Sequence, residues 1–410
     1  MQLDDLDRKA TADFEGYVVR KDLVRTFSRQ FPVPTYVVEF LLGRYCATTD
    51  EAEIQEGLDI VQRQLASRTV KAGEEELFKA RARESGSVKI IDIITARLDS
   101  KTDSYLASLP SLRLTDVRLS PEMVKENERM LTGGFYAEVT LGYDASIAQE
   151  KNGRPFGVDA LRAIQLSKRE VLDVLAKGRE QFTTAEWRDL LLRSVGFEPA
   201  TLSERAKDAL LLRMVPFVER NYNLVELGPK GTGKSHIYSE FSPHGMLISG
   251  GEVTVPKLFV NNANGRIGLV GYWDVVAFDE FAGKKKRTDK ALVDIMKNYM
   301  ANKSFSRGVE TLGAEASMVF VGNTSHNVPY MLKHSDLFDE LPEAYHDSAY
   351  LDRLHFYIPG WEVDTIRSEM FSAGYGFVVD YIAEILKSMR DADYSDRYQS
   401  HFALGSDIST

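Results

Sequence analysis

The sequence predicts an α/β core in its C-terminal half, preceded by a domain of the α+β class. From Asn223 onward, short apolar runs alternate with helical patterns, and a glycine-rich segment follows the first apolar run. Before that core, helical periodicity gives way to three β-rich stretches at 88–98, 112–119 and 135–143. We therefore expect an α+β domain over 1–150, an α/β core with a preceding helical segment over 151–360, and an incomplete helical lid over 361–410.

The N-terminal domain is expected to begin with helices. Apolar residues between Val18 and Phe27 form a stripe, and helical patterns continue at 36–45 and 54–65. The β-rich stretches that follow predict a small barrel or sheet. We expect a linker over 145–155, where Lys, Asn, Gly and Arg occur together, and a return to helices from about 155 to 218.

Composition limits the class of protein. The 410 residues carry a formal net charge of −10, which argues against a chain that coats nucleic acid or membrane by bulk charge but leaves a local basic surface open. Cys46 is the single cysteine, so no intrachain disulfide and no Cys/His zinc cluster is expected. The polar start resembles no signal peptide, and no apolar run approaches the 18 or so residues of a membrane span. We expect a cytoplasmic protein without a membrane partner.

The glycine-rich segment matches the phosphate-binding pattern G-x-x-x-x-G-K-[ST] at every defined position. Its glycines allow backbone N–H groups to surround phosphate oxygens, its lysine can reach the β- and γ-phosphates, and its last hydroxyl can bind Mg²⁺. The alternative is an ordinary glycine-rich turn. We expect an ATP site made by Gly228, Pro229, Lys230, Gly231, Thr232, Gly233, Lys234 and Ser235.

Two later apolar runs are each followed directly by polar side chains. Asp279 and Glu280 follow the run 275–278, and Asn323 follows the run 318–322. In a nucleotide hydrolase one acid, here Asp279, would hold Mg²⁺ with Ser235, while Glu280 would orient the attacking water. The Asn323 amide could hold that water near the γ-phosphate. The alternatives are a strand followed by a solvated turn for the acids and a turn cap for the amide.

The order of these elements resembles that of AAA+ ATPases. A helix over 292–299 and a hairpin over 302–311 lie between the acids and Asn323, as in the clade of MCM helicases, Lon and NtrC-type activators. The segment Asp352-Arg353-Leu354-His355 resembles the Ser-Arg-Phe-Asp element of MCM proteins, although its first and last residues differ. That resemblance makes Arg353 an arginine finger that completes the site of a neighbouring subunit. The alternative is a surface arginine near a sheet edge.

A more specific resemblance covers the whole chain. The segments LDDLDRKATADFEGYVVRKDLV, PTYVVEFLLGRYCATTDEAEI and LVELGPKGTGKSHIYSEFSPHGMLISGGEVTVPKLF are similar to the BrxL family, the Lon-like AAA+ proteins of BREX phage-defence systems. The resemblance implies an N-terminal DNA-binding domain, an AAA+ motor and a Lon-protease-like domain. It also implies hexameric rings, single or stacked, that enclose double-stranded DNA and act with other BREX components.

The chain ends at 406–410 in a pattern typical of a helix start, so we expect the sensor-2 arginine and the Lon-like domain to lie beyond it. No proteolytic Ser-Lys dyad can be assigned to these residues, and protease activity is not expected of them.

Two groups of basic residues are candidates for DNA contact. The first lies in loops after the acids and in the hairpin, where mobile cations could follow phosphates without reading bases; the second lies on one ridge of an N-terminal helix. Solvated charge is the alternative for both groups. The candidates are Lys284, Lys285, Lys286, Arg287, Lys303 and Arg307 in the first group, and Lys21, Arg25 and Arg29 in the second.

Two further functions stay open at this point. An ATP-dependent protein remodeller or protease subunit would need an aromatic residue in its pore loop, and Phe305 in the hairpin is available for that role. An ATP-gated scaffold would assemble on nucleotide binding and turn over slowly. Stimulation of ATP hydrolysis by DNA distinguishes a DNA-engaging ATPase from a remodeller, and assembly that needs only ATP binding favours the scaffold.

Overall fold

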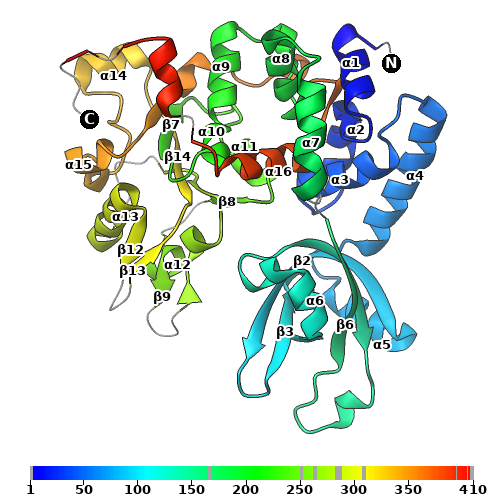
Figure 1. The fold of residues 1–410 in the computed structure, drawn as a ribbon. Helices are drawn as coiled ribbons and strands as arrows, with labels where there is room; N and C mark the ends of the chain where they lie inside the picture. Colours follow the sequence, from blue (N-terminus) through cyan, green and yellow to red (C-terminus); the bar gives the residue numbers. More distant parts are fainter. Residues whose placement is uncertain are drawn as a thin grey trace.

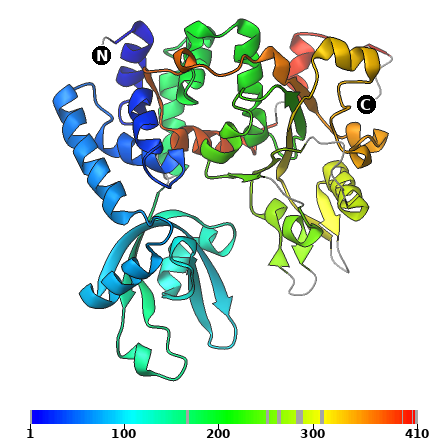
Figure 2. The same ribbon diagram turned by 180° about the vertical axis from the view of Figure 1, so that it is seen from behind.

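The computed structural model describes residues 3–164, 168–249, 253–261, 266–281, 289–306, 311–393, 395–403 and 405–406. Its elements form a five-stranded barrel, a five-stranded parallel sheet with helices on both faces, and a set of N-terminal helices (Figure 1). Viewed from behind, the N-terminal helices and the parallel sheet lie on opposite sides of the green helices in the middle of the molecule (Figure 2). In the described residues no helix is both long and apolar enough to cross a membrane.

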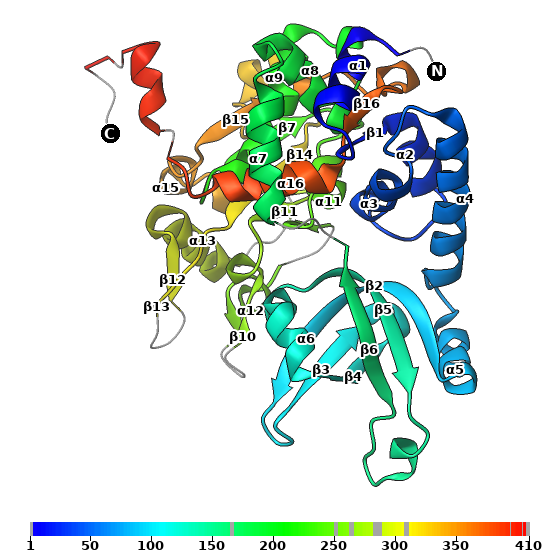
Figure 3. The same ribbon diagram turned by 45° about the vertical axis from the view of Figure 1, so that its right-hand side comes forward.

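The barrel is closed and has its own core. Its strands are ordered β2-β3-β4-β6-β5; β4 and β6 are parallel and the other neighbours are antiparallel. Helix α6 (Pro121–Glu126) lies between β4 and β5 in the chain, and α5 (Glu75–Ser85) packs outside β2 (Figure 3). The strands are β2 (Ser87–Asp99), β3 (Ser104–Leu109), β4 (Leu114–Leu119), β5 (Phe135–Tyr143) and β6 (Phe156–Ala163).

The barrel confirms the three β-rich stretches and corrects the expectation for the residues after them. The segment 145–155 is the connection between β5 and β6 rather than a linker between domains, and 156–163 is a strand rather than the start of a helical region. Helices begin only with α7 (Lys168–Arg179). The local pattern misleads because β6 is defined by its pairing with β5 and β4 rather than by a clear alternation of its own.

The parallel sheet has the order β15-β7-β14-β11-β8. Alternate side chains of each strand enter two different cores: Val275 and Ala277 of β11 join one, and Val276 and Phe278 join the other. Both faces are therefore covered, as near-continuous apolar runs require. The strands are β7 (Leu224–Gly228), β8 (Gly245–Ile248), β11 (Val275–Phe278), β14 (Ser317–Asn323) and β15 (Phe356–Pro359).

Helices on the two faces of the sheet complete these cores. The first face carries α9 (Glu204–Leu212), α10 (Val215–Val218) and α11 (His236–Glu240), and the second carries α12 (Val255–Leu258) and α13 (Lys290–Asn302). The predicted helix over 292–299 and the predicted hairpin are both confirmed. The remaining small elements of this part of the chain are β9 (Val260–Asn261), β10 (Arg266–Ile267), the hairpin strands β12 (Ser304–Ser306) and β13 (Thr311–Gly313), α14 (Val328–His334) and α15 (Ser348–Leu351).

The N-terminal helices share the first core with the parallel sheet, and Ile91 of the barrel strand β2 also reaches this core. Strand β1 (Val18–Arg20) pairs with β16 (Tyr375–Phe377), and α16 (Val379–Met389) packs against the N-terminal helices and α7. Helix α16, which lies in the segment expected to form a lid, is almost wholly buried in this core. The division into domains at residues 150 and 360 stays a prediction. The helices are α1 (Asp5–Asp13), α2 (Lys21–Ser28), α3 (Thr35–Tyr45), α4 (Glu51–Arg68) and α8 (Thr184–Ser194).

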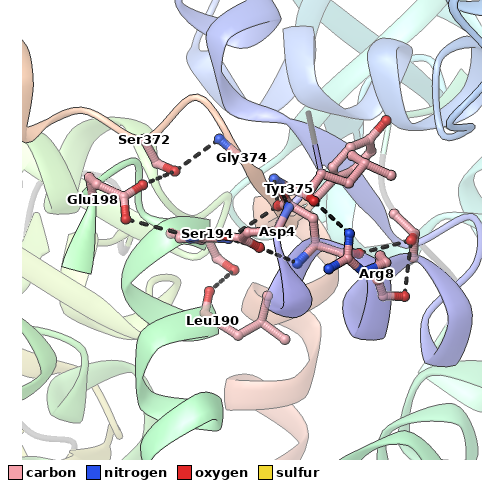
Figure 4. Close-up of polar contacts among 12 residues, drawn as sticks. Asp4, Arg8, Leu190, Ser194, Glu198, Ser372, Gly374 and Tyr375 are labelled. Carbon is pink, nitrogen blue, oxygen red and sulfur yellow. Dashed lines mark hydrogen bonds and ion pairs between the residues drawn. The ribbon is translucent and has the colours of Figure 1, made fainter. Parts of the chain in front are cut away.

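A polar network fixes the first helix to the segment before α16 (Figure 4). The Arg193 guanidinium on α8 pairs with Asp4 at 2.5 Å and with Asp7 at 3.1 Å, and Asp7 also accepts the backbone N–H of Tyr375. The Ser194 hydroxyl accepts the N–H of Phe377 and donates to a carbonyl one helical turn earlier. Since these contacts join residues from both ends of the described chain, the N-terminal helices and β16 form one unit.

Candidate nucleotide-binding site

The phosphate-loop sequence lies between β7 and the short helix α11, at the carboxyl edge of the parallel sheet. Gly231 and Gly233 have φ values of +80° and +73°, a left-handed conformation that other residues adopt at a cost. A Cβ on Gly233 would lie 2.7 Å from Ile366 Cδ1, and a Cβ on Gly228 would lie 2.5 Å from the backbone of Gly360. The glycines therefore serve both the curvature of the loop and its close contact with the segment after β15.

Lys234 is buried, with 6% of its surface exposed, and its ammonium points back into the loop. Nζ donates to the carbonyls of Pro229 at 2.5 Å and Gly228 at 3.3 Å. Burial lowers the pKa of Lys234 below its ordinary value, while the carboxylates of Glu226 and Asp279 act in the opposite direction. An ammonium that donates to the carbonyls of such a loop is placed to donate to the oxygens of a phosphate bound there.

A buried ion pair supports the loop from beneath. Arg213, which follows α9, donates from Nε and Nη2 to the carboxylate of Glu226 at 2.9 and 2.6 Å, and from Nη1 to the carbonyl of Thr232 at 3.1 Å. Arg213 is 1% exposed and Glu226 is 0% exposed. This pair is not among the residues predicted from the sequence. The signal was present, because a glutamate inside an otherwise apolar strand requires a buried cationic partner.

The two acids and the amide lie at the same edge of the sheet as the loop. Asp279 and Glu280 follow β11, and Asn323 ends β14 in register with Gly228. Strand β14 lies between β7 and β11, so Asn323 stands between the loop and the acids. The N–H of Thr324 also donates to the carbonyl of Gly228 at 3.1 Å. The structure therefore brings together the loop, both acids and the amide, as the sequence predicts.

The backbone at the acids is unusual. Glu280 has φ +53°, which is uncommon for a residue with a side chain, and its N–H donates to Oδ1 of Asp279 at 2.7 Å. Backbone of this kind is frequent at functional sites. The Asp279 carboxylate is half-buried, and Glu280 is exposed beyond the end of the strand. Together with the hydroxyl of Ser235, these oxygens are of the kind that Mg²⁺ prefers.

Arg353 lies away from this edge. It precedes β15, whose first residue pairs with Leu224 at the start of β7, so it stands at the opposite end of the strands from the loop. Its Nη1 donates to the carbonyl of Ala349, and its own carbonyl accepts from the side chain of Asn223 at 3.4 Å. The side chain is half-buried. Arg353 thus does not contribute to the loop of its own chain.

The basic candidates separate into three groups. The prediction for Lys21 is wrong: it is 2% exposed, and its Nζ donates to Glu39 at 2.8 Å and to the carbonyl of Phe377 at 2.7 Å. Helical spacing could not reveal this, because both partners come from elements distant in sequence. Arg29 and Lys303 are exposed, and Arg25 is half-buried. Lys284, Lys285, Lys286, Arg287 and Arg307 lie outside the described residues.

Phe305, the candidate aromatic residue of a pore loop, is buried rather than exposed. It is 3% exposed and packs against Phe259 and Tyr299, with ring centroids 5.2 and 6.2 Å away. An aromatic residue that grips polypeptide must reach the pore, so this side chain no longer supports a protein-remodelling function.

A glycine-rich loop, two acids and an amide at the carboxyl edge of a parallel sheet define an α/β protein of the nucleotide-binding ATPase class. Consistent with this, residues 156–410 match the family model described as "Lon-like protease BrxL-like, ATPase domain". Residues 12–143 match the model described as "BREX system Lon protease-like protein BrxL N-terminal". The chain therefore belongs to the BrxL family of Lon-like proteins.

Two curated relatives show the extent of the similarity. The chain is 46% identical over 405 residues to "Lon-like protease BrxL" of Escherichia coli O9:H4 (strain HS), covering 99% of this chain and 58% of that protein. It is 46% identical over 408 residues to "Lon-like protease BrxL" of Bacillus cereus (strain H3081.97), covering 99% of this chain and 60% of that protein. The chain thus spans about three-fifths of the length of these relatives.

Proposed function

We propose that this chain is an AAA+ protein that hydrolyses ATP and engages double-stranded DNA in BREX phage defence. The observation that carries the proposal is the convergence of Lys234, Asp279, Glu280 and Asn323 at one sheet edge. The insertion of β14 between the loop strand and the acidic strand supports the AAA+ assignment, because it places Asn323 between the acids and the phosphate loop.

The residues of the site have separate roles in this proposal. The loop 228–235 binds the phosphates, and Lys234 exchanges its carbonyl contacts for the β- and γ-phosphate oxygens. Ser235 and Asp279 hold Mg²⁺, which when bound neutralises charge on the phosphates. Glu280 orients the attacking water and accepts its proton, and Asn323 positions that water by hydrogen bonding. All these groups come from neighbouring strand ends, so the rigid sheet fixes their spacing.

The position of Arg353 supports assembly into rings. An arginine at the end of the sheet opposite to its own loop can complete a site only on another subunit, where it would stabilise charge on the γ-phosphate. We propose a hexameric ring, single or stacked, in which each nucleotide lies between two subunits. The other BREX components remain proposed partners.

The barrel supports a role in DNA binding. Five strands in the order β2-β3-β4-β6-β5, with a helix between β4 and β5, have the connectivity of an OB fold. Such barrels bind nucleic acid over their second and third strands and the loops between strands one and two and between four and five. The corresponding loops here carry the exposed Lys101 and Lys151. We propose these loops as the N-terminal DNA contact, together with the basic residues after the acids.

The test of the proposal is the rate of ATP hydrolysis with and without duplex DNA. Stimulation by DNA supports a DNA-engaging ATPase. A clear basal rate without a DNA response would favour protein remodelling, and ATP-dependent assembly without turnover would favour a scaffold.

The barrel contact is tested with the double variant Lys101→Glu/Lys151→Glu. It should weaken duplex binding and reduce the salt dependence of log K by about 2, since two phosphate contacts are lost. The matched control is Lys177→Glu on the exposed side of α7, which should bind as the wild type does. Equal binding by the double variant and the control would refute the barrel contact.

A further inference from the structure

A cavity of about 410 Å³ lies directly beside the phosphate loop, on the side of Gly233. Its wall combines three parts of the chain: loop and α11 residues such as Gly233 and Ile237, the aromatic pair Phe197 and Phe371, and one face of the N-terminal helix α2. The lining is mainly apolar with a few polar groups, which is typical of a small-molecule site. Gly233 therefore belongs both to the phosphate loop and to the wall of this cavity.

The face of α2 that lines this cavity carries polar atoms without hydrogen-bond partners. Nε of Arg25 and Oγ of Ser28 are both buried, and neither finds a partner among the described residues. Leaving such atoms unpaired is costly, so each calls for a ligand group or another partner. The Arg25 guanidinium lies 5.2 Å from the centre of the Phe371 ring, and that ring stacks on Phe197 with centroids 6.5 Å apart.

We propose that this cavity holds the nucleoside of the bound nucleotide and that Arg25 and Ser28 of α2 contact it. The inference rests on the proposed function, since the phosphates must occupy the adjoining loop. The aromatic pair and the planar guanidinium offer flat surfaces to a purine base, and the two unpartnered atoms offer hydrogen bonds to the base or the ribose. Arg25, a candidate for DNA contact on sequence grounds, is thereby assigned to the nucleotide.

This contact ties nucleotide binding to the N-terminal segment of the chain. Helix α2 begins directly after β1 and is fixed by the buried pair of Lys21 and Glu39. The same segment continues through α3 and α4, and Arg68 at the end of α4 forms an ion pair with Glu138 on the barrel strand β5. A nucleoside bound against α2 thus contacts the segment to which the barrel is attached.

The experiment compares two ligands on the complete chain. ATP occupies both the loop and the cavity, whereas inorganic tripolyphosphate occupies the loop alone. For Arg25→Ala we expect the Kd for ATP, measured by calorimetry, to rise by roughly tenfold, because a charge-assisted contact is lost. The Kd for tripolyphosphate should stay at the wild-type value. Ser28→Ala should show the same selectivity with a smaller rise. Thr26→Ala, an exposed neighbour on α2, is the matched control and should leave both constants unchanged.

The outcomes separate this inference from the function on which it rests. Wild-type protein that binds neither ligand refutes the proposed nucleotide site itself. Normal ATP binding by both Arg25→Ala and Ser28→Ala overturns the inference and leaves the nucleotide site intact. Equal weakening of ATP and tripolyphosphate also overturns it, because α2 would then only support the fold of the loop.

Discussion

The buried pair of Arg213 and Glu226 allows a sharp test of how the phosphate loop is supported. The perturbation is Arg213→Met, which keeps much of the side-chain volume and removes three hydrogen bonds. Glu226 would then be a carboxylate with no exposed surface and no cation, and the carbonyl of Thr232 would lose its donor.

The magnitude follows from burial. Breaking a buried ion pair by removing one partner costs about 3–5 kcal/mol, a large part of the roughly 5–15 kcal/mol that stabilises a typical domain. Replacing both partners is different. In Arg213→Met/Glu226→Leu neither charge of the pair stays buried, so the main remaining loss is the donor to Thr232, at about 1 kcal/mol. The double variant should therefore recover most of the stability that the single variant loses.

The assay is urea unfolding followed by tryptophan fluorescence, combined with ATP binding. A matched control lies on α9, the helix that precedes Arg213: Arg205 pairs with Glu362 at the surface, with 68% of the arginine side chain exposed. Arg205→Met should cost less than about 1 kcal/mol. The double variant should fold stably yet bind ATP more weakly than the wild type, because Thr232 in the loop has lost its anchor.

Two results would refute this reasoning. If Arg213→Met lowered stability no more than Arg205→Met, the pair would not be buried as described. If the double variant were as unstable as Arg213→Met, the loss would come from packing rather than from the unpaired carboxylate of Glu226.

Three further predictions concern catalysis and pH. Lys234→Ala should abolish measurable ATP binding in calorimetry, because the phosphates lose their main side-chain cation. Glu280→Gln should bind ATP as the wild type does and hydrolyse it roughly 10²–10⁴-fold more slowly in a phosphate-release assay; a wild-type rate would disprove its role as base. Burial lowers the pKa of His244 to about 4, although the hydrogen bond to Glu384 at 2.7 Å acts to raise it. The unfolded state takes up this proton near the ordinary pKa of about 6.5, so stability should fall by about 3 kcal/mol between pH 6.5 and 4. The melting temperature measured against pH should show this loss, and His244→Gln should flatten the curve; an unchanged curve in that variant would contradict the assignment.

The nucleotide-site geometry could be predicted from sequence because its signals are local. The loop pattern, the apolar runs before Asp279 and before Asn323, and the hairpin each depend on neighbours within about ten residues. Because the strands are parallel, their carboxyl ends lie at one edge of the sheet, and no knowledge of long-range contacts is needed to predict this. This is why the loop, the acids and the amide converge as expected.

The features that were missed depend on contacts distant in sequence. Lys21 has the spacing of an exposed ridge, yet its partners are Glu39 and the carbonyl of Phe377. Strand β6 shows weak alternation and is defined by pairing with β5 and β4. Phe305 occupies a hairpin, and only the packing of Phe259 against it shows that it is buried. Periodicity gives the face of an element but not what covers that face.

The pairing of β1 with β16 has a consequence for synthesis on the ribosome. Lys21, beside β1, and its backbone partner at Phe377 are separated by 356 positions, which take roughly 20–70 s to translate at 5–20 residues per second. During that interval the barrel, whose strands all lie within 87–163, can complete its own core as a nascent chain. The N-terminal helices cannot, because their apolar surface is covered only when β16 and α16 emerge. These helices are thus made before the barrel yet enclosed after it, and that interval is when a chaperone would be most needed.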